Sequence, residues 1–401
     1  MTDRSHRADH APGWPIPGFT STGSKRPEAL FGPGELEADI PLQMSRASGC
    51  RVWDTHGREY VDYIMALGAV ALGYAHPEVT RAATAAVECG VVGPLAPELE
   101  AEVGDTIRRL MPWIEQVRFL KTGAEACAAA VRLARLFTGR DRVLGCGYHG
   151  WLDWCQGGGS AGVPAATRAL YGEIPFNDAE AARRLIRAAG DELACVVTEP
   201  IVVTEPTAEW IETLRAETAR VGALLVIDEV KTVCRIAVGG GTERYGLQPD
   251  LVVLGKAIAN GFPLAAVGGR RDVMAGVSHT WISSTLSTEY VSLAAAKATL
   301  GVVERERVPA HLAHVGGRLL AGLRALRTRY PVVVTGAAGI AELCFLQFAS
   351  EHQAQAVARG CARRGVLFKR SAYNFVSLAH DDAMVDHTLS VLDEVLAQLS
   401  G

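Results

Sequence analysis

The chain has 401 residues, which is enough for a large domain and a smaller one. Apolar residues make up 49% of it and charged residues 21%, as in ordinary soluble globular proteins. The formal net charge of −4 gives no indication of binding to nucleic acid or to an anionic membrane. No apolar run approaches the roughly 20 residues that span a bilayer. The first residues also hold no apolar signal core, so we expect a cytoplasmic protein.

The nine cysteines are scattered singly along the sequence. None of them forms a Cys-x-x-Cys pair, which argues against a zinc site or a redox dithiol. We therefore expect no metal site, and reduced thiols that are mostly buried.

In the first part of the chain, the segment through residue 34 is rich in Pro, Gly, Ser and Thr and is expected to be irregular. Two strand patterns follow, at 51–54 and 59–62, and they flank the turn residues 55–58. This spacing predicts a β-hairpin.

From about residue 98 onward, helix and strand patterns alternate. Short runs rich in Val, Leu and Ile are separated by segments of helical length. We expect strands at 116–120, 142–144, 194–197, 223–227 and 251–254, and helices at 99–110, 124–137 and 208–220. Apolar strands with helical crossovers predict an α/β fold with a mostly parallel sheet covered on both faces. In such sheets the chemistry gathers at the carboxyl ends of the strands.

After about residue 308 the pattern is that of a smaller α+β domain, to which part of the N-terminal segment contributes. Expected helices are 312–326, 354–364 and 384–399, with strands at 342–348 and 375–378. The predicted division is an N-terminal segment 1–70, a large domain 71–305 and a C-terminal domain 306–401.

Two acids, Asp228 and Glu229, end the apolar run at 223–227. Burying carboxylates is costly unless they have partners. A protonated pyridine nitrogen is one such partner, because an ionised aspartate keeps the ring cationic and makes it a stronger electron sink. Acids in this position could instead cap the next turn or bind a metal.

Lys256 follows the next apolar run and a glycine. A lysine that is desolvated or near positive charge has a lowered pKa, so its amine can attack an aldehyde. By itself, such a lysine would more often extend its amine to water. One strand after Asp228, it favours a pyridoxal-phosphate (PLP) site in which Lys256 carries the cofactor as a Schiff base.

Two weaker features support this interpretation. The strand at 116–120 leads into Thr122 and Glu125, which have the spacing of a helix capping box, and Gly123 between them would let a phosphate approach the backbone. An ordinary capped helix explains these residues equally well. Tyr148 follows the strand at 142–144 and could stack on a ring or pack under a loop.

Taken together, the residues resemble class III aminotransferases of PLP fold type I, and are most similar to the branch that contains glutamate-1-semialdehyde 2,1-aminomutase. The most specific stretch runs from Ile227-Asp228-Glu229-Val230 through Gly255-Lys256-Ala257-Ile258-Ala259-Asn260-Gly261. The resemblance covers nearly the whole chain. It implies a mostly parallel sheet flanked by helices, with a smaller domain from the N- and C-terminal segments.

For the ring of the cofactor, the resemblance implies four roles. Lys256 would form the Schiff base and Asp228 would pair with the pyridine nitrogen. Val230 would pack against one ring face and Tyr148 would cover the other.

For the phosphate and the assembly, the resemblance implies that Gly123 and Ala124 donate backbone N–H groups to the phosphate. Thr285 would reach into the site of a neighbouring subunit, which implies a homodimer. Glu199 matches an active-site glutamate of the family.

The sequence also departs from the family pattern. Ala124 lacks a hydroxyl that often helps to hold the phosphate, and residues 232–235 read Thr-Val-Cys-Arg in place of Thr-Gly-Phe-Arg. Leu67-Gly68-Ala69 stands where this branch often has Trp-Gly-Pro, which should reshape the substrate pocket. Arg26 could clamp a substrate carboxylate or be a solvated surface charge. The loop 156–164 resembles a gate over the site, or is a plain flexible loop.

The predicted activity is transfer of an amino group from an amino donor to a keto or aldehyde acceptor, through a Lys256 Schiff base and a pyridoxamine phosphate intermediate. An intramolecular 2,1-aminomutase would use the same residues, as would a PLP decarboxylase or racemase. A non-catalytic homologue that acts as a binding partner is the alternative from another class.

Overall fold

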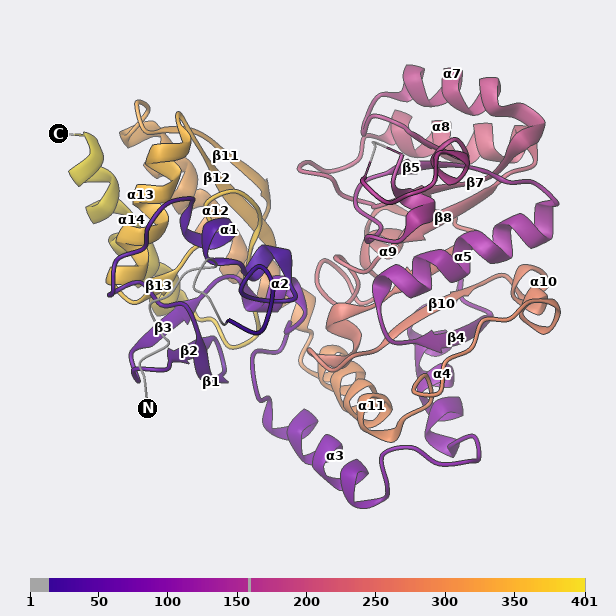
Figure 1. Cartoon of the computed structure of the whole chain (residues 1–401), viewed down its shortest axis with the longest axis horizontal. Coiled ribbons are helices and arrows are strands. Elements are labelled where there is room, and N and C mark those ends of the chain that lie inside the picture. The colour runs from indigo at the N-terminus through magenta and orange to yellow at the C-terminus, as the bar shows by residue number, and fades with distance from the viewer. Residues whose placement is uncertain (1–13, 158–159, 401) are drawn as a thin grey trace. The chain divides into compact units, whose positions relative to one another are not determined.

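A computed structural model of the chain describes residues 14–157 and 160–400, in two compact units (Figure 1). One unit comprises 1–76 and 311–401, and the other comprises 77–310. The sequence places these divisions after residues 70 and 305. None of the helices in the described ranges combines the length and the apolar character needed to cross a membrane.

The 77–310 unit is built on a seven-stranded sheet with the order β4-β10-β9-β8-β7-β5-β6. Its strands are β4 (Gln116–Leu120), β5 (Arg142–Cys146), β6 (Tyr171–Glu173), β7 (Leu193–Thr198), β8 (Leu224–Asp228), β9 (Leu251–Leu254) and β10 (Ala265–Gly269). All neighbours are parallel except β10, which is antiparallel to both β4 and β9. The predicted α/β fold with a mostly parallel sheet is confirmed. Strands β6 and β10 were not expected from the sequence.

The helices of this unit are α3 (Pro77–Glu88), α4 (Glu98–Leu110), α5 (Gly123–Thr138), α6 (Ala165–Arg168), α7 (Ala179–Ala189), α8 (Ala208–Val221), α9 (Gly240–Tyr245), α10 (Arg271–Met274) and α11 (Tyr290–Arg305). Short 3-10 turns are η2 (Asp153–Cys155), η3 (Gly190–Glu192), η4 (Lys256–Ala259) and η5 (Ala275–His279).

Helices cover both faces of this sheet, as continuous apolar strands require. Along β8, Val226 packs into the core with α5, whereas Leu225 and Ile227 pack with α7 and α8 on the other face. Because side chains alternate along a strand, Asp228 belongs to the α5 face. The strand periodicity therefore decides to which side of the sheet this carboxylate projects.

The other unit has two small sheets, with orders β1-β2-β3-β13 and β11-β12-β14. Its strands are β1 (Met44–Ser48), β2 (Arg51–Asp54), β3 (Glu59–Asp62), β11 (Val334–Ile340), β12 (Leu343–Phe348), β13 (Val366–Leu367) and β14 (Asn374–Phe375). Its helices are η1 (Gly23–Lys25), α1 (Pro27–Phe31), α2 (Met65–Gly68), α12 (Val308–Arg329), α13 (Glu351–Arg363) and α14 (Asp382–Ser400).

Within that unit the predicted hairpin is confirmed as β2 and β3, which pair antiparallel. The prediction of an irregular segment through residue 34 is wrong for η1 and α1, and residues 1–13 lie outside the described residues. Pro27 starts α1 at its first position, where its missing N–H costs nothing. Phe31 then buries its ring with Ile40 and with α13, so long-range packing stabilises this short helix.

Candidate active site

Six of the seven strands, all except β10, run in one direction and end at one edge of the sheet. The polar residues expected from the sequence follow these ends. Thr122 comes after β4, Tyr148 after β5, Glu199 after β7, Asp228 closes β8, and Lys256 comes after β9. Parallel topology alone therefore gathers these residues at one edge, as expected for an open α/β sheet.

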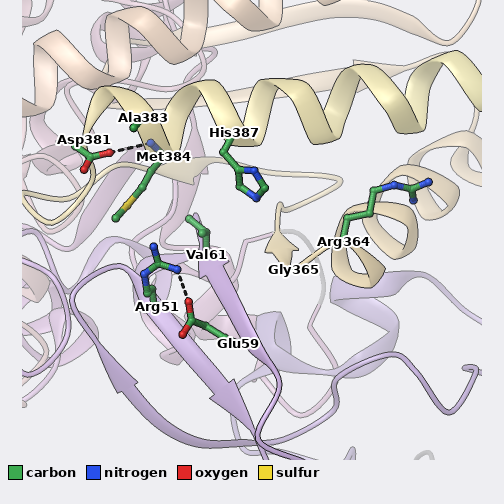
Figure 2. A pocket seen from close by; sticks show the side chains of 9 residues that line it. All are labelled: Arg51, Glu59, Val61, Arg364, Gly365, Asp381, Ala383, Met384 and His387. Atoms are coloured by element: carbon green, nitrogen blue, oxygen red, sulfur yellow. Dashed lines mark hydrogen bonds and ion pairs between the residues drawn. The ribbon is translucent and has the colours of Figure 1, made fainter.

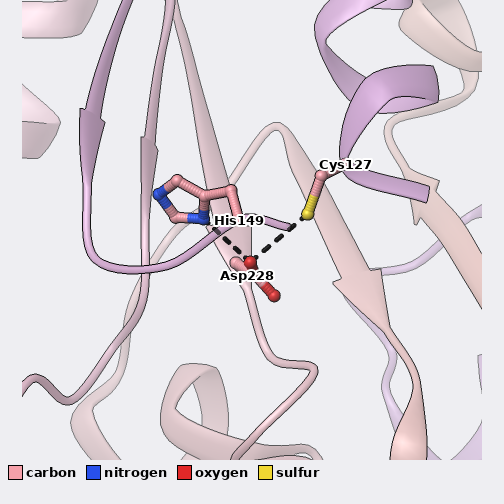
Figure 3. A group of neighbouring side chains, drawn as sticks. All are labelled: Cys127, His149 and Asp228. Atoms are coloured by element: carbon pink, nitrogen blue, oxygen red, sulfur yellow. Dashed lines mark hydrogen bonds and ion pairs between the residues drawn. The ribbon is translucent and has the colours of Figure 1, made fainter. Parts of the chain in front are cut away.

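Asp228 lies in a buried cluster with Cys127 and His149 (Figure 3). His149 Nδ1 lies 2.8 Å from Asp228 Oδ2, and the Cys127 thiol donates to the same oxygen over 3.3 Å. The backbone N–H of Val230 donates to Oδ1 over 3.1 Å. Burial by itself raises the pKa of Asp228, but the hydrogen bond and charge of His149, with the other two donors, bring it below its usual value. Asp228 is thus held as a carboxylate.

The same three side chains could in principle bind a metal ion, because one ligand atom from each lies within 4.8 Å of the others. Two observations favour a hydrogen-bonded cluster. Both neighbours already contact Asp228 Oδ2 directly. Burial, together with the nearby Asp228 charge, also raises the pKa of the Cys127 thiol well above its usual value, and a neutral thiol is a poor metal ligand.

Lys256 begins η4 directly after Gly255, with a left-handed backbone (φ 47°) that is unusual for a residue with a side chain. Its amine is mostly buried, and burial lowers its pKa. The charges of Asp228 and Glu199 oppose this lowering, and those of Lys231 and Arg235 add to it. The amine is therefore shifted toward its neutral, nucleophilic form.

The start of α5 has backbone N–H groups that are available to an anion. Thr122 and Glu125 make a full capping box, in which Glu125 Oε2 accepts from the Thr122 N–H at 2.9 Å. Across the described ranges, no recorded hydrogen bond uses the N–H groups of Gly123 or Ala124. A phosphate would find two donors and the positive end of a helix macrodipole there.

The Val230 side chain lies close to both Gly123, at the start of α5, and Gly255, which precedes Lys256. A Cβ on Gly123 would lie 3.0 Å from the Val230 methyl groups, and a Cβ on Gly255 would lie 3.4 Å from them. In the loop after β5, a Cβ on Gly150 would lie 2.5 Å from Ala124 Cβ. These close approaches bring the loop after β8, the start of α5 and the loop after β5 together.

The donors and acceptors at this edge fit PLP. Asp228 would supply a carboxylate for the pyridine nitrogen, Lys256 an amine for the aldehyde, and the start of α5 two N–H groups for the phosphate. His149 Nε2 is also buried without a hydrogen-bond partner among the described residues, so the cluster around Asp228 still has an unused polar atom.

Glu199 is fixed from two sides. The backbone N–H of Tyr148 donates to its Oε2 over 3.0 Å, and Lys231 Nζ lies 2.8 Å from its Oε1. A Cβ on Gly147 would lie 2.5 Å from Glu199 Oε2, so this carboxylate sits directly under the loop after β5. The Tyr148 side chain itself is 70% exposed in the single chain.

The Glu229 carboxylate does not join the cluster around Asp228 and instead binds the segment that follows it. Its Oε1 accepts from the Thr242 N–H at 2.5 Å and from the Thr242 hydroxyl at 2.7 Å, and its Oε2 accepts from the Gly241 N–H at 2.8 Å and from the Thr232 hydroxyl. Of the two acids that end the apolar run, one therefore faces the candidate site and the other holds the segment 229–242.

Three further predicted residues belong to segments other than these strand ends. Thr285 is exposed on the turn before α11. Arg26 and Leu67 belong to the other unit, where the Arg26 guanidinium packs on Gly18 and Leu67 has a left-handed backbone (φ 59°). The predicted gate at 156–164 contains residues 158 and 159, which lie outside the described residues.

A separate hollow of about 490 Å³ occurs in the unit that contains the two small sheets (Figure 2). Its walls include the Arg51–Glu59 ion pair and His387. None of the predicted site residues lines it. We therefore place the chemistry at the carboxyl edge of the seven-stranded sheet.

Sequence reasoning missed three residues of this edge, Cys127, His149 and Lys231. Cys127 carried no signal, since it lies within an ordinary helical pattern. His149 stood in the Tyr-His-Gly run but was given no role. Lys231 is a cation directly after the Asp-Glu-Val run, and that position could have drawn attention to it.

Comparisons with known proteins show the family to which the chain is related. The family profile for aminotransferase class-III matches residues 35–398. Glutamate-1-semialdehyde 2,1-aminomutase of Neisseria gonorrhoeae is 34% identical over 96% of this chain and 96% of its own length.

Two solved structures are also similar to this chain. The FumI protein of Sphingopyxis sp. MTA144, in its PLP internal aldimine form, has a TM-score of 0.86 with 27% identity, over 91% of this chain and 90% of that one. A β-phenylalanine aminotransferase from Variovorax paradoxus has a TM-score of 0.81 with 29% identity, over 91% and 90%.

Proposed function

The chain belongs to the class III aminotransferase family of PLP-dependent enzymes, and from that premise we propose that it moves an amino group between an amino donor and a carbonyl acceptor, with Lys256 as the reacting amine. The predicted resemblance, the fold and the PLP cofactor are confirmed by the comparisons. The roles of individual residues and the identities of the substrates are part of the proposal.

One observation carries the proposal: Lys256 and Asp228 stand at the same edge of the sheet, and the pKa of each is shifted toward the protonation state that the reaction needs. Bound PLP supplies an aromatic ring that accepts the electron pair released at the substrate carbon. Asp228, held ionised by His149 and Cys127, keeps a proton on the pyridine nitrogen. The amine of Lys256 moves a proton between the substrate α-carbon and C4′ of the cofactor.

A second candidate is intramolecular transfer within one substrate. It is favoured by the 34% identity to a glutamate-1-semialdehyde 2,1-aminomutase over nearly the full chain. Leu67-Gly68-Ala69, where that branch often has Trp-Gly-Pro, favours transfer between two substrates.

A spectroscopic half-reaction separates the two candidates. PLP-loaded protein is mixed with single amino donors, and we expect at least one donor to abolish the visible absorption of the cofactor. A keto acid or an aldehyde should then restore it. If glutamate 1-semialdehyde alone is converted to its isomer with the amino group moved, without any second carbonyl compound, the aminomutase is the correct candidate. Full absorption with every donor, and no conversion, would contradict both.

We also propose that the enzyme is a homodimer, in which Thr285 completes the partner's site. The support is an exposed apolar surface on the 77–310 unit. Leu95 and Trp281 are each 81% exposed and Leu286 is 50% exposed. The Val91 carbonyl accepts a hydrogen bond from the Tyr290 N–H over 2.9 Å, which joins the loop before α4 to the start of α11. Light scattering should give about twice the chain mass, and a monomer at micromolar concentration would contradict this proposal.

A further inference from the structure

The ion pair of Lys231 with Glu199 lies at the same edge as Lys256. Lys231 Nζ lies 2.8 Å from Glu199 Oε1, and the two side chains are only 11% and 9% exposed. Most ion pairs of this chain are far more exposed, such as Lys297 with Glu102, at 53% and 41%. A pair with so little contact with water is weakly screened, so its charges act strongly on neighbouring groups.

The charged partner of the Glu199 carboxylate at this edge is Lys231. Its Oε2 is fixed by the Tyr148 N–H, and its Oε1 is paired with Lys231. Without the Lys231 ammonium, the negative charge of Glu199 would have the Lys256 amine as another cation within its electrostatic reach. A carboxylate near an amine stabilises the protonated, unreactive form of that amine.

We propose that Lys231 neutralises Glu199 and so keeps this carboxylate from stabilising the protonated amine of Lys256, which leaves that amine able to react with the cofactor. Lys231 is thus a positioning residue that acts through Glu199. The inference rests on the proposed role of Lys256 as the reacting amine.

The charges around Lys256 agree with this role. Asp228 and Glu199 favour the charged amine, whereas Lys231 and Arg235 disfavour it. Asp228 already has its own partners in His149 and Cys127. Exchanging Lys231 for a neutral residue would therefore remove the cation beside Glu199 Oε1. The protonation equilibrium of the Lys256 amine would then shift toward the protonated form.

The test measures the rate at which full-length, cofactor-depleted protein captures added PLP on Lys256, as a function of pH. The adduct is fixed with borohydride and counted by peptide mass spectrometry. For Lys231→Met we expect capture about tenfold slower than wild type near neutral pH, which corresponds to one pKa unit at Lys256. The two rates should approach each other as the pH rises, because the amine becomes neutral in both proteins once the pH exceeds its pKa in each.

Three further variants make the result specific. Lys231→Arg keeps the cation and should match wild type within about twofold. The double variant Glu199→Gln with Lys231→Met removes both charges, and should recover most of the lost rate. Lys297→Met removes a lysine from an exposed ion pair, and should not change the pH profile.

A rate for Lys231→Met that equals wild type, or that is lower by one constant factor at every pH, would overturn the inference. So would a double variant as slow as Lys231→Met, because the effect would then not pass through Glu199. A wild-type protein that forms no adduct on Lys256 at any pH would instead contradict the proposed function itself.

Discussion

Replacing Lys256 with alanine should lower the single-turnover rate of amino transfer by about 10⁴-fold or more in PLP-loaded protein. The variant loses both the nucleophile that holds the cofactor and the amine that moves the proton. The Lys231 amine cannot substitute directly, because it is paired with Glu199. The measurement is a rapid-mixing half-reaction with the donor that reacts best with wild type.

The fold should survive this replacement. Burial lowers the pKa of Lys256, which means that the folded chain disfavours the charged amine relative to the unfolded chain. This cost to stability is full below the folded pKa of Lys256, shrinks as the pH rises from there, and is gone above the unfolded pKa of lysine. In cofactor-free protein at neutral pH, Lys256→Ala should therefore have a free energy of unfolding equal to or greater than that of wild type.

Two controls complete the experiment. Lys297→Ala removes an exposed lysine and should keep full activity. Lys256→Arg keeps a cation but cannot form the covalent bond, and should be as inactive as Lys256→Ala. If Lys256→Ala retains its visible absorption after gel filtration and still turns over, Lys256 does not have the proposed role.

Asp228→Asn is expected to lower the same rate by roughly 10³-fold. Asparagine has nearly the same shape and can still accept from His149 and Cys127, so the cluster should remain packed. It has no negative charge, however, and cannot hold a proton on the pyridine nitrogen. The loss should therefore appear in the chemical step, with PLP still bound through Lys256.

A matched control comes from the opposite edge of the same strands. Asp250 accepts from the Leu225 N–H over 2.8 Å and pairs with Arg270 at 2.5 Å, just before β9 begins. Asp250→Asn should lower the thermal midpoint and leave the single-turnover rate within about threefold of wild type. Equal losses of rate in the two variants would show that Asp228 acts only through stability.

Much of the fold was predictable from local patterns. Strand β9 has the bounds expected from the apolar run at 251–254, and the hairpin of β2 and β3 matches its predicted ranges. Strand β10 was missed because it reads Ala-Ala-Val-Gly-Gly, a composition with little strand preference. Packing requires a small residue in this strand, because a Cβ on Gly268 would lie 2.7 Å from an Ile114 methyl group.

The sequence by itself determined which residues stand at the carboxyl ends of the strands. Alternation of apolar strands and helices fixes a parallel sheet, and a parallel sheet places Asp228, Glu199 and Lys256 at one edge. These assignments depend only on short-range periodicity and on topology, which one sequence can reveal.

Only the tertiary structure decided which partners those residues take. In the structure Asp228 contacts His149 and Cys127, and Glu199 forms an ion pair with Lys231. Glu229 accepts hydrogen bonds from the segment 232–242. Several of these partners come from segments far apart in the chain, and spacing does not encode their distance. A buried carboxylate must find donors within about 3 Å, and which donors those are depends on how the helices and loops pack.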